Sequence, residues 1–349
     1  MRDNKWWRLR EIPKLDVEME QAARKRVLSL TKPVGSLGIL EEIVIRLAGI
    51  TGEPIPDISQ KAVVVMCGDH GVAQAGVSAY PQEVTGLMIE NFVRGKAAVN
   101  VLAHIAGARV VVADVGSLME QVPEGVIHCK VRKGTRNFLK EPAMTESEAM
   151  QAIEAGMQLA HQLGEQGVRM IAPGEMGIGN TTSASALAAV LTGEDVEALT
   201  GRGTGITDER LARKQETIRR ALALHKPANP SEALICVGGL EIAGMVGLYL
   251  GAAQKRMAAV MDGLISTVAA AIAVSMEPAV KSYLFASHLS SEPAHRVLLN
   301  HLELTPLITA GMRLGEASGA ALTFPLFDAA VALAERMATF AELGLPNPE

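Results

Sequence analysis

Short apolar runs, each followed by a glycine or a polar side chain, recur along this chain and constrain its fold more than any other feature. Longer stretches with helical periodicity separate most of them, for example 147–163 and 208–224. Buried strands that alternate with helices predict an α/β fold with a doubly wound, mostly parallel, Rossmann-like sheet. The expected strands are 62–67, 109–115, 168–172, 233–237, 257–261 and 282–286.

The polar groups that follow these runs predict where a ligand binds. In a parallel sheet the carboxyl ends of the strands meet at one edge, and ligands bind there. We therefore expect one composite pocket. The residues that follow the predicted strands and should line this pocket are Gly68-Asp69-His70-Gly71, Asp114, Gly174-Glu175, Gly238-Gly239, Asp262-Gly263 and Ser287-His288.

The two ends of the chain differ from its middle. Residues before about 60 and after about 300 show helical patterns and no convincing strand. We expect a large α/β substrate-binding domain over residues 61–300. Residues 1–60 and 301–349 would together form a smaller helical domain. A chain of 349 residues is long enough for both and for a substantial core.

Composition excludes several classes of protein. A net charge of -5 and an aromatic content of 3% give no support to nucleic-acid binding. Cys67, Cys129 and Cys236 lack metal-ligand spacing, which indicates buried free thiols in a reducing compartment. The first seven residues lack the apolar core of a signal peptide, so we expect a cytoplasmic protein. The apolar stretch 257–276 is long enough to span a membrane, but Asp262-Gly263 interrupts it and favours a buried strand, a loop and a helix.

The run at 168–172 leads into a glycine-rich segment, Gly174 to Thr182, with a helix-like stretch behind it. A strand that ends in glycines and opens into a helix presents free amides and the positive end of a helix dipole, which suits a phosphate. Asn180, Thr181 and Thr182 suit the cap of the following helix. The segment matches neither the dinucleotide fingerprint nor the Lys-containing nucleotide loop, and a plain glycine turn is an equal alternative. A second set of donors lies at 201–206, with Lys214 as a possible cationic partner.

Glu316 lies among small and apolar residues in a C-terminal helical region. Apolar surroundings destabilise an ionised carboxylate, so the pKa of Glu316 should rise toward the range of a general base. The alternative is a glutamate that pairs with Arg313 or is exposed. Asp69 and His70 suit catalysis, metal binding or merely an ordered loop, with metal binding the least favoured, and no Ser-centred nucleophile motif is present.

Taken together, these segments resemble the nicotinate-nucleotide:dimethylbenzimidazole phosphoribosyltransferase family over almost the whole chain. The resemblance implies transfer of the 5-phosphoribosyl group of nicotinate mononucleotide to a lower-ligand base such as 5,6-dimethylbenzimidazole. The products would be α-ribazole 5′-phosphate and nicotinate, in cobamide biosynthesis, and the reaction would need no cofactor and no metal. The segments that carry the resemblance are 32–38, 68–72, 80–85, 174–182, 262–263, 287–292 and 313–322.

The resemblance also implies roles for individual residues. Glu316 would accept the proton that the attacking azole loses, and Glu175 would contact the ribose. Tyr80 and Met88 would line the pocket of the aromatic base, with helix packing as their alternative role. The other implied substrate-binding residues are Gly177, Ile178, Gly203, Gly205 and Lys214 at the phosphate, Asp262 and Ser291 along the cleft, and Leu314.

Two departures from the family pattern concern the base. Ala317 stands where the family often has Gly, and the stretch 85–88 lacks a Gln that could bond the second ring nitrogen of a benzimidazole. Leu87 and Met88 offer apolar contact only, so phenol or p-cresol is an alternative acceptor, used by one subunit of a heteromeric pair of paralogues.

Two further readings compete with an active transferase. A catalytically silent partner subunit would be expected to lose Glu316 or the glycine-rich loop, and this chain retains both. An oxidoreductase would need a dinucleotide fingerprint, which is missing here. The resemblance implies a homodimer, or a heterodimer with a paralogue, and we expect no nucleic-acid or membrane partners.

Overall fold

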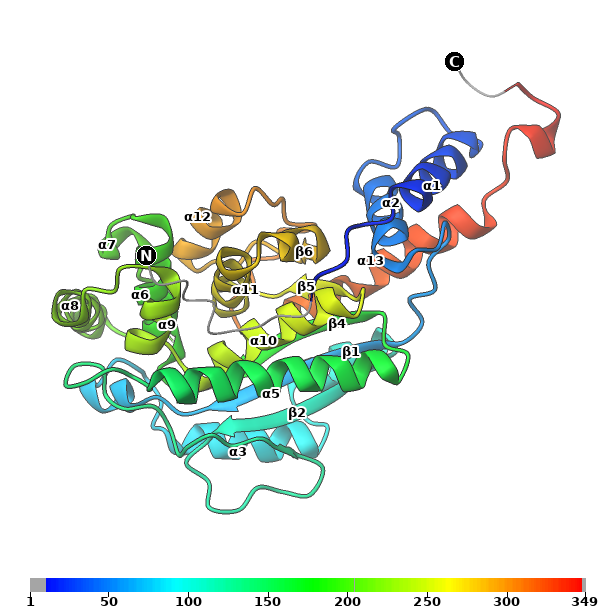
Figure 1. Ribbon diagram of the computed structural model, residues 1–349. Helices are drawn as coiled ribbons and strands as arrows, with labels where there is room; N and C mark the ends of the chain where they lie inside the picture. Colours follow the sequence, from blue (N-terminus) through cyan, green and yellow to red (C-terminus); the bar gives the residue numbers. More distant parts are fainter. Residues whose placement is uncertain (1–10, 204, 347–349) are drawn as a thin grey trace.

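The computed structural model describes residues 11–203 and 205–346, so the expectation for the first seven residues and Thr204 of the second donor segment lie outside the described residues. A six-stranded sheet with strand order β3-β2-β1-β4-β5-β6 forms the centre of the molecule (Figure 1). Every neighbouring pair is parallel, which confirms the predicted doubly wound sheet. The strands are β1 (Lys61–Gly68), β2 (Ala108–Gly116), β3 (Ile127–His128), β4 (Met170–Met176), β5 (Ala258–Met261) and β6 (Leu284–Ala286).

The chain order reverses at the centre of this sheet. β1 pairs with β2 on one side and with β4 on the other, so the connections leave it in opposite directions. Ligands of such folds bind at the carboxyl ends of the strands beside this reversal. β1 is buried at every position, as expected of a central strand covered on both faces.

Helices cover both faces of the sheet. On one face α10 (Leu240–Gln254) lies against the strands and α5 (Glu146–Glu165) packs over it; on the other face lie α3 (Glu83–Val93) and α4 (Ala98–Ile105) (Figure 1). Glycines permit the close approach of α5 and α10, because a Cβ atom on Gly156 would lie 1.9 Å from the Gly244 carbonyl oxygen. The remaining helices of the α/β part are α6 (Asn180–Thr192), α7 (Val196–Leu199), α8 (Asp208–His225), α9 (Pro230–Val237), α11 (Leu264–Met276) and α12 (Pro293–His301), with short 3-10 turns at Gly71–Ala75 and Pro278–Tyr283.

The two ends of the chain pack together. Helices α1 (Val17–Ser29) and α2 (Ile39–Thr51) lie beside α13 (Ser318–Arg336) at the upper right of Figure 1. Arg26 joins them, because its Nε atom donates to the Ala334 carbonyl oxygen at 2.8 Å. The beginning of α13 contacts β4 and α4, so the C-terminal segment also reaches the sheet. A last 3-10 turn follows at Ala341–Leu343.

One predicted strand is wrong. Residues 233–237 lie in α9, which begins with the helix-start signals Asn229, whose side chain accepts from the Glu232 amide, and Pro230 in the first turn. A short apolar run has no periodicity that separates a buried strand from a buried helix, and these signals were the better guide. The two-residue, exposed β3 was not predicted.

Two other expectations have clear outcomes. The stretch 257–276 folds as β5 and α11 with Asp262-Gly263 between them, as predicted. Among the helices of the described residues, none combines the length and the hydrophobicity of a membrane span.

All three cysteines are free, but only Cys67 is buried. Cys129 and Cys236 are half-buried because they lie near the ends of elements at the surface. The prediction of buried thiols is therefore wrong for these two residues.

Candidate active site

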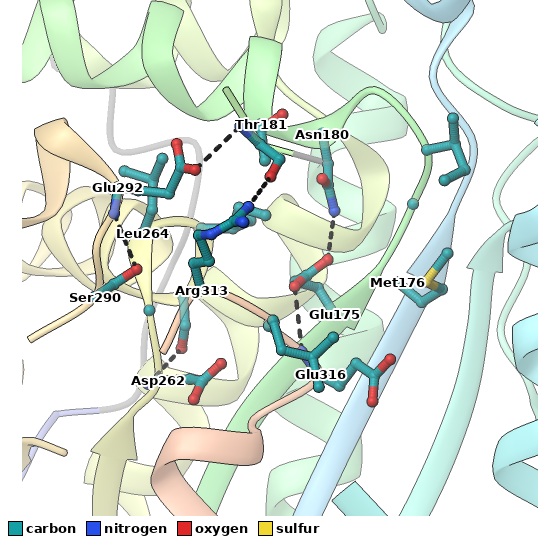
Figure 2. Close-up of a pocket in the computed structure, with 18 of the residues that line it drawn as sticks. Glu175, Met176, Asn180, Thr181, Asp262, Leu264, Ser290, Glu292, Arg313 and Glu316 are labelled. Carbon is teal, nitrogen blue, oxygen red and sulfur yellow. Dashed lines mark hydrogen bonds between the residues drawn. The ribbon is translucent and has the colours of Figure 1, made fainter. Parts of the chain in front are cut away.

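A cleft of about 600 Å³ opens at the carboxyl ends of β4 and β5. Figure 2 shows Glu175, Asp262, Glu292 and Arg313 around it, with Glu316 on the turn that precedes α13. The structure brings nine of the twelve residues expected at a site to its wall: Tyr80, Met88, Glu175, Gly177, Ile178, Gly203, Asp262, Leu314 and Glu316.

Three expected residues lie outside this wall. Lys214 is fully buried behind it, on α8. Gly205 lies in the same surface turn as Gly203, with a φ of +92°, and a Cβ atom added to it would meet no atom within 4 Å. Ser291 is exposed, and its amide donates to the Met312 carbonyl oxygen at 3.0 Å. Ser290, its neighbour, lines the cleft in its place.

The glycine-rich segment 174–182 begins at the end of β4 and continues into α6, and residues 177–179 form the loop between them. Gly179, with a φ of +101°, is the cap residue of α6, and no side chain caps that helix, so the expected capping by Asn180, Thr181 and Thr182 is wrong. The reason is that tertiary partners take two of these side chains. The side-chain amide of Asn180 donates to the Glu175 carboxylate, and the Thr181 hydroxyl accepts from the Lys214 ammonium group.

Two amides of the expected phosphate site already have side-chain partners. The Ile178 amide donates to the Thr85 hydroxyl at 3.1 Å, and the Gly203 amide donates to Glu292 Oε1 at 3.0 Å. The Gly203 partner is a carboxylate, which shows that this amide faces a position suited to an anionic oxygen. Arg313 lies beside it, and its guanidinium donates to the Gly203 carbonyl oxygen at 3.1 Å.

Lys214 supports this end of the cleft from within. Its ammonium group donates to Thr181 Oγ1 at 2.9 Å and to the Gly201 carbonyl oxygen at 3.2 Å. It is not the solvated side chain that an isolated lysine would be, because α8 packs over the loop. Burial lowers the pKa of Lys214 to about 8, against a smaller opposite effect of Glu292.

Glu316 lies on an unusual turn. Gly315, Glu316 and Ala317 have φ values of 88°, 63° and 65°, all in the left-handed region. The Glu316 side chain is buried, and its Oε2 atom has no hydrogen-bond partner among the described residues. Burial, and then the negative charge of Asp262, raise the pKa of Glu316 to about 7, while the Val99 amide at the start of α4 opposes this rise.

Neither alternative for Glu316 matches the structure. It is not exposed, and Arg313 bonds Gly203 instead of pairing with it. In Figure 2 its carboxylate points away from Glu175 and Asp262. A buried carboxyl group with a pKa near neutrality and one free oxygen can accept a proton from a ligand.

Glu175 links the loop to this turn. One of its oxygens accepts from Asn180, and the other accepts from the Glu316 amide at 3.4 Å. Burial, followed by the charges of Glu241 and Asp262, raises the pKa of Glu175 to about 8. The carboxyl group of Glu175 is therefore protonated more readily than that of an exposed glutamate.

A family model described as phosphoribosyltransferase matches residues 12–345 of the chain. The nicotinate-nucleotide–dimethylbenzimidazole phosphoribosyltransferase of Desulforamulus reducens is 49% identical over 341 residues, which are 97% of each chain. The enzyme of the same name from Pseudomonas putida is 47% identical over 345 residues, 98% of each chain. The crystal structure of CobT from Thermus thermophilus has a TM-score of 0.91 and 45% identity, and covers 95% of this chain and 100% of that chain.

This chain belongs to the nicotinate-nucleotide–dimethylbenzimidazole phosphoribosyltransferase family. The resemblance found in the sequence is thereby confirmed, and the oxidoreductase reading is wrong.

In this phosphoribosyltransferase, several apolar side chains line one part of the cleft wall. Tyr80 is 56% exposed and lines the cleft, so it is not a helix-packing residue. Met88 on α3 is half-buried and both lines the cleft and packs on the core. Val84, Met176 and Leu314 complete this wall.

Sequence reasoning assigned no role to several residues that the structure places in or under the cleft. Arg313 was considered only as a partner of Glu316, and Glu292 and Thr85 lie within the segments 287–292 and 80–85 without a role of their own. A signal existed for Glu292, because it follows the last predicted strand and directly precedes Pro293, a helix-start residue. No local signal identified Thr85, whose partner Ile178 is 93 residues away.

His70 lies beneath the glycine-rich loop and not in the cleft. Its Nε2 atom is 2.6 Å from Glu241 Oε1, its Nδ1 atom is 3.0 Å from the Ser183 hydroxyl, and all three side chains are buried. The chain of bonds ties β1, α6 and α10 together, so an ordered loop is the better reading of Asp69 and His70. Residues 11–203 and 205–346 contain no group of three His, Cys, Asp or Glu side chains arranged to hold a metal ion.

Proposed function

We propose that this protein transfers the 5-phosphoribosyl group of nicotinate mononucleotide to 5,6-dimethylbenzimidazole or a close analogue. The products are α-ribazole 5′-phosphate and nicotinate, for cobamide biosynthesis. One observation carries the proposal: Glu316, buried and with a pKa raised to about 7, shares a cleft with the glycine-rich loop. Relatives that match nearly the full chain carry the corresponding name.

The chemistry fits this arrangement. A ring nitrogen of the base attacks C1′ of the ribose, and the bond from C1′ to the pyridinium nitrogen breaks with its electron pair going to that nitrogen. Nicotinate leaves with a neutral ring. The azole proton passes to the free oxygen of the Glu316 carboxylate.

The two ends of the cleft suit the two ends of the substrates. Arg313 bonds the Gly203 carbonyl oxygen and Lys214 bonds Thr181 and the Gly201 carbonyl oxygen, so cations flank the Gly203 amide and the 5′-phosphate suits this end. The apolar wall of Met88, Met176 and Leu314 suits the flat face of an aromatic base.

An assay with a panel of bases tests this function. Purified protein, nicotinate mononucleotide and each of dimethylbenzimidazole, benzimidazole, phenol and p-cresol are incubated, and nicotinate release and the mass of the riboside phosphate are measured. We expect an N-linked riboside from the benzimidazoles at the highest rate. A preference for phenol or p-cresol would overturn the assigned base, and no nicotinate release with any acceptor would overturn the function.

We further propose that the enzyme acts as a homodimer in the cytoplasm and that 1–60 and 301–349 form its smaller domain. Exposed apolar side chains on α3 and α4 support the dimer, including Leu87 and Ile105, the latter 72% exposed. Three free cysteines fit a reducing compartment. Light scattering should give twice the chain mass for wild type and a single chain mass for Ile105→Glu. A wild-type monomer would favour a heteromeric partner instead.

A further inference from the structure

The turn that carries Glu316 needs an external support. Glu316 and Ala317 are L-residues in the left-handed region, where contact between the Cβ atom and the backbone makes each conformation unfavourable. Such residues persist only where the surrounding structure holds them. The turn leads directly into α13, whose cap residue is Ala317, and an alanine side chain cannot accept hydrogen bonds from the first free amides of the helix.

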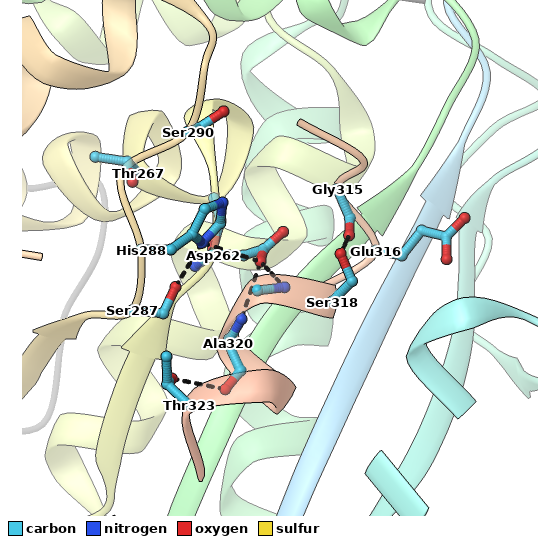
Figure 3. Close-up of polar contacts among 12 residues, drawn as sticks. Asp262, Thr267, Ser287, His288, Ser290, Gly315, Glu316, Ser318, Ala320 and Thr323 are labelled. Carbon is cyan, nitrogen blue, oxygen red and sulfur yellow. Dashed lines mark hydrogen bonds and ion pairs between the residues drawn. The ribbon is translucent and has the colours of Figure 1, made fainter. Parts of the chain in front are cut away.

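Asp262, which lies far from α13 in the chain, supplies the missing cap. It follows β5, and its Oδ1 atom accepts from the Gly319 amide at 2.7 Å and from the Ala320 amide at 3.0 Å (Figure 3). These are the second and third residues of α13, the positions that a capping side chain normally satisfies. Asp262 therefore replaces the side chain that Ala317 lacks.

The approach of Asp262 to α13 is close and specific. A Cβ atom on Gly319 would lie 2.9 Å from Asp262 Oδ1 and 2.1 Å from His288 Nδ1, so only glycine admits both side chains. His288 lies beside the same oxygen, with its Nδ1 atom 3.9 Å from Asp262 Oδ1. Asp262 is only 3% exposed. Both hydrogen bonds of its Oδ1 atom go to amides of α13, so this oxygen is directed to the helix, although the residue also lines the cleft.

We propose that Asp262 is a positioning residue, which fixes the start of α13 and thereby aims the Glu316 carboxylate, and that it does not bind the sugar. The proposal deepens the proposed function and rests on it. Glu175 acts with Asp262, because it accepts from the Glu316 amide on the other side of the turn.

The test compares two variants of Asp262 with a matched control. Asp262→Ala removes the cap, whereas Asp262→Asn keeps a side-chain oxygen that can accept from the same amides. The control is Asp16→Ala. Asp16 Oδ1 caps α1 in the same way, accepting from the Glu18 and Met19 amides at 3.1 Å each, and α1 lies away from the cleft.

The kinetic expectation separates positioning from substrate binding. Asp262→Ala should lower kcat about 100-fold, the effect of a misplaced catalytic group, and change KM for nicotinate mononucleotide less than about threefold. Asp262→Asn should recover kcat to within about tenfold of wild type, and Asp16→Ala should leave kcat and KM unchanged. A KM raised tenfold or more in Asp262→Ala with kcat retained would show a sugar ligand and overturn the proposal, as would an unchanged kcat.

Amide hydrogen exchange gives a second readout that does not depend on activity. Exchange in a peptide covering 315–321 should accelerate at least tenfold in Asp262→Ala and stay near the wild-type rate in Asp262→Asn and Asp16→Ala. Unchanged exchange in Asp262→Ala would overturn the proposal. If wild type shows no transferase activity, the proposed function fails, and the exchange result still decides whether Asp262 holds the turn.

Discussion

Gly174 on β4 lies directly against Ala317, so closely that a Cβ atom on Gly174 would stand 2.7 Å from the Ala317 nitrogen and 2.7 Å from the Glu316 carbonyl carbon. The strand that leads to the glycine-rich loop is thus also the floor under the turn that carries the candidate base. This contact joins two parts of the candidate active site that lie 143 positions apart in the chain (317 minus 174).

Replacing Gly174 should therefore displace the candidate general base Glu316 and also destabilise the fold. In Gly174→Ala the new methyl group meets backbone atoms, which cannot move aside as a flexible side chain can. We expect kcat to fall at least about tenfold and the free energy of unfolding to fall by about 1 to 3 kcal/mol. Steady-state kinetics and urea unfolding measure both. Gly164→Ala on α5 is the control, because the atoms nearest to its Cβ atom belong to Lys255, which does not line the cleft, so activity should not change.

Glu316→Gln should remove proton acceptance while keeping the size and packing of the side chain. General-base catalysis contributes about 10² to 10⁴ in rate, so kcat should fall by that factor with little change in KM. Product formation followed by mass spectrometry measures the loss, and the exposed Glu335→Gln should match wild type. A Glu316→Gln rate within about threefold of wild type would contradict the general-base role.

The pH profile should report two groups. Glu316 must be ionised to accept a proton and its pKa is about 7, so wild-type kcat/KM should rise about tenfold per pH unit below pH 7 and level off between pH 7 and 8. Glu316→Gln should lose this limb. Lys214 has a pKa of about 8, and its cationic form is lost above that value, so KM for nicotinate mononucleotide should rise as the pH passes 8.

Lys214→Met tests the second group directly. The variant keeps a long apolar stem but loses both hydrogen bonds and the buried charge. These charge-assisted bonds, which contribute about 1.5 to 3 kcal/mol each, hold Thr181 and the segment before Gly203 in place, so their loss should misplace the phosphate-binding groups and raise KM about 10- to 100-fold. Lys226→Met, exposed at the end of the same helix, should have no effect. Equal KM values in the two variants would place the phosphate elsewhere.

Glu175 should make the protein less stable at alkaline pH. Its pKa is about 8 in the folded chain and about 4.5 when unfolded, so between these values the folded state binds more protons than the unfolded state. The contribution of Glu175 to the free energy of unfolding is therefore fully present below about pH 4.5 and is lost as the pH rises through 8. Glu175→Gln should therefore raise the free energy of unfolding at pH 8.5 by on the order of 1 to 3 kcal/mol and change it little at pH 5. Thermal unfolding at both values measures the difference; an equal effect at both would show that the carboxyl group does not titrate there.

The strands show which features local sequence can predict. β1, β2, β4, β5 and β6 follow from apolar runs long enough to fill a covered sheet and from the glycines and carboxylates that end them. α9 was mistaken for a strand because its eight residues are too few and too apolar to show a helical period. Its start signals at Asn229 and Pro230 lie outside the apolar run that suggested the strand.

The sequence by itself determined the sheet, the family and the edge at which the candidate site lies, because these depend on short-range patterns and on motif order. Only the tertiary structure decided what the polar side chains do. Asn180 and Thr181 leave their own helix for Glu175 and Lys214, Lys214 is buried, and Asp262 caps a helix that begins 56 residues later (318 minus 262). A hydrogen bond forms with whichever partner the fold brings within about 3 Å, and chain separation places no limit on that choice.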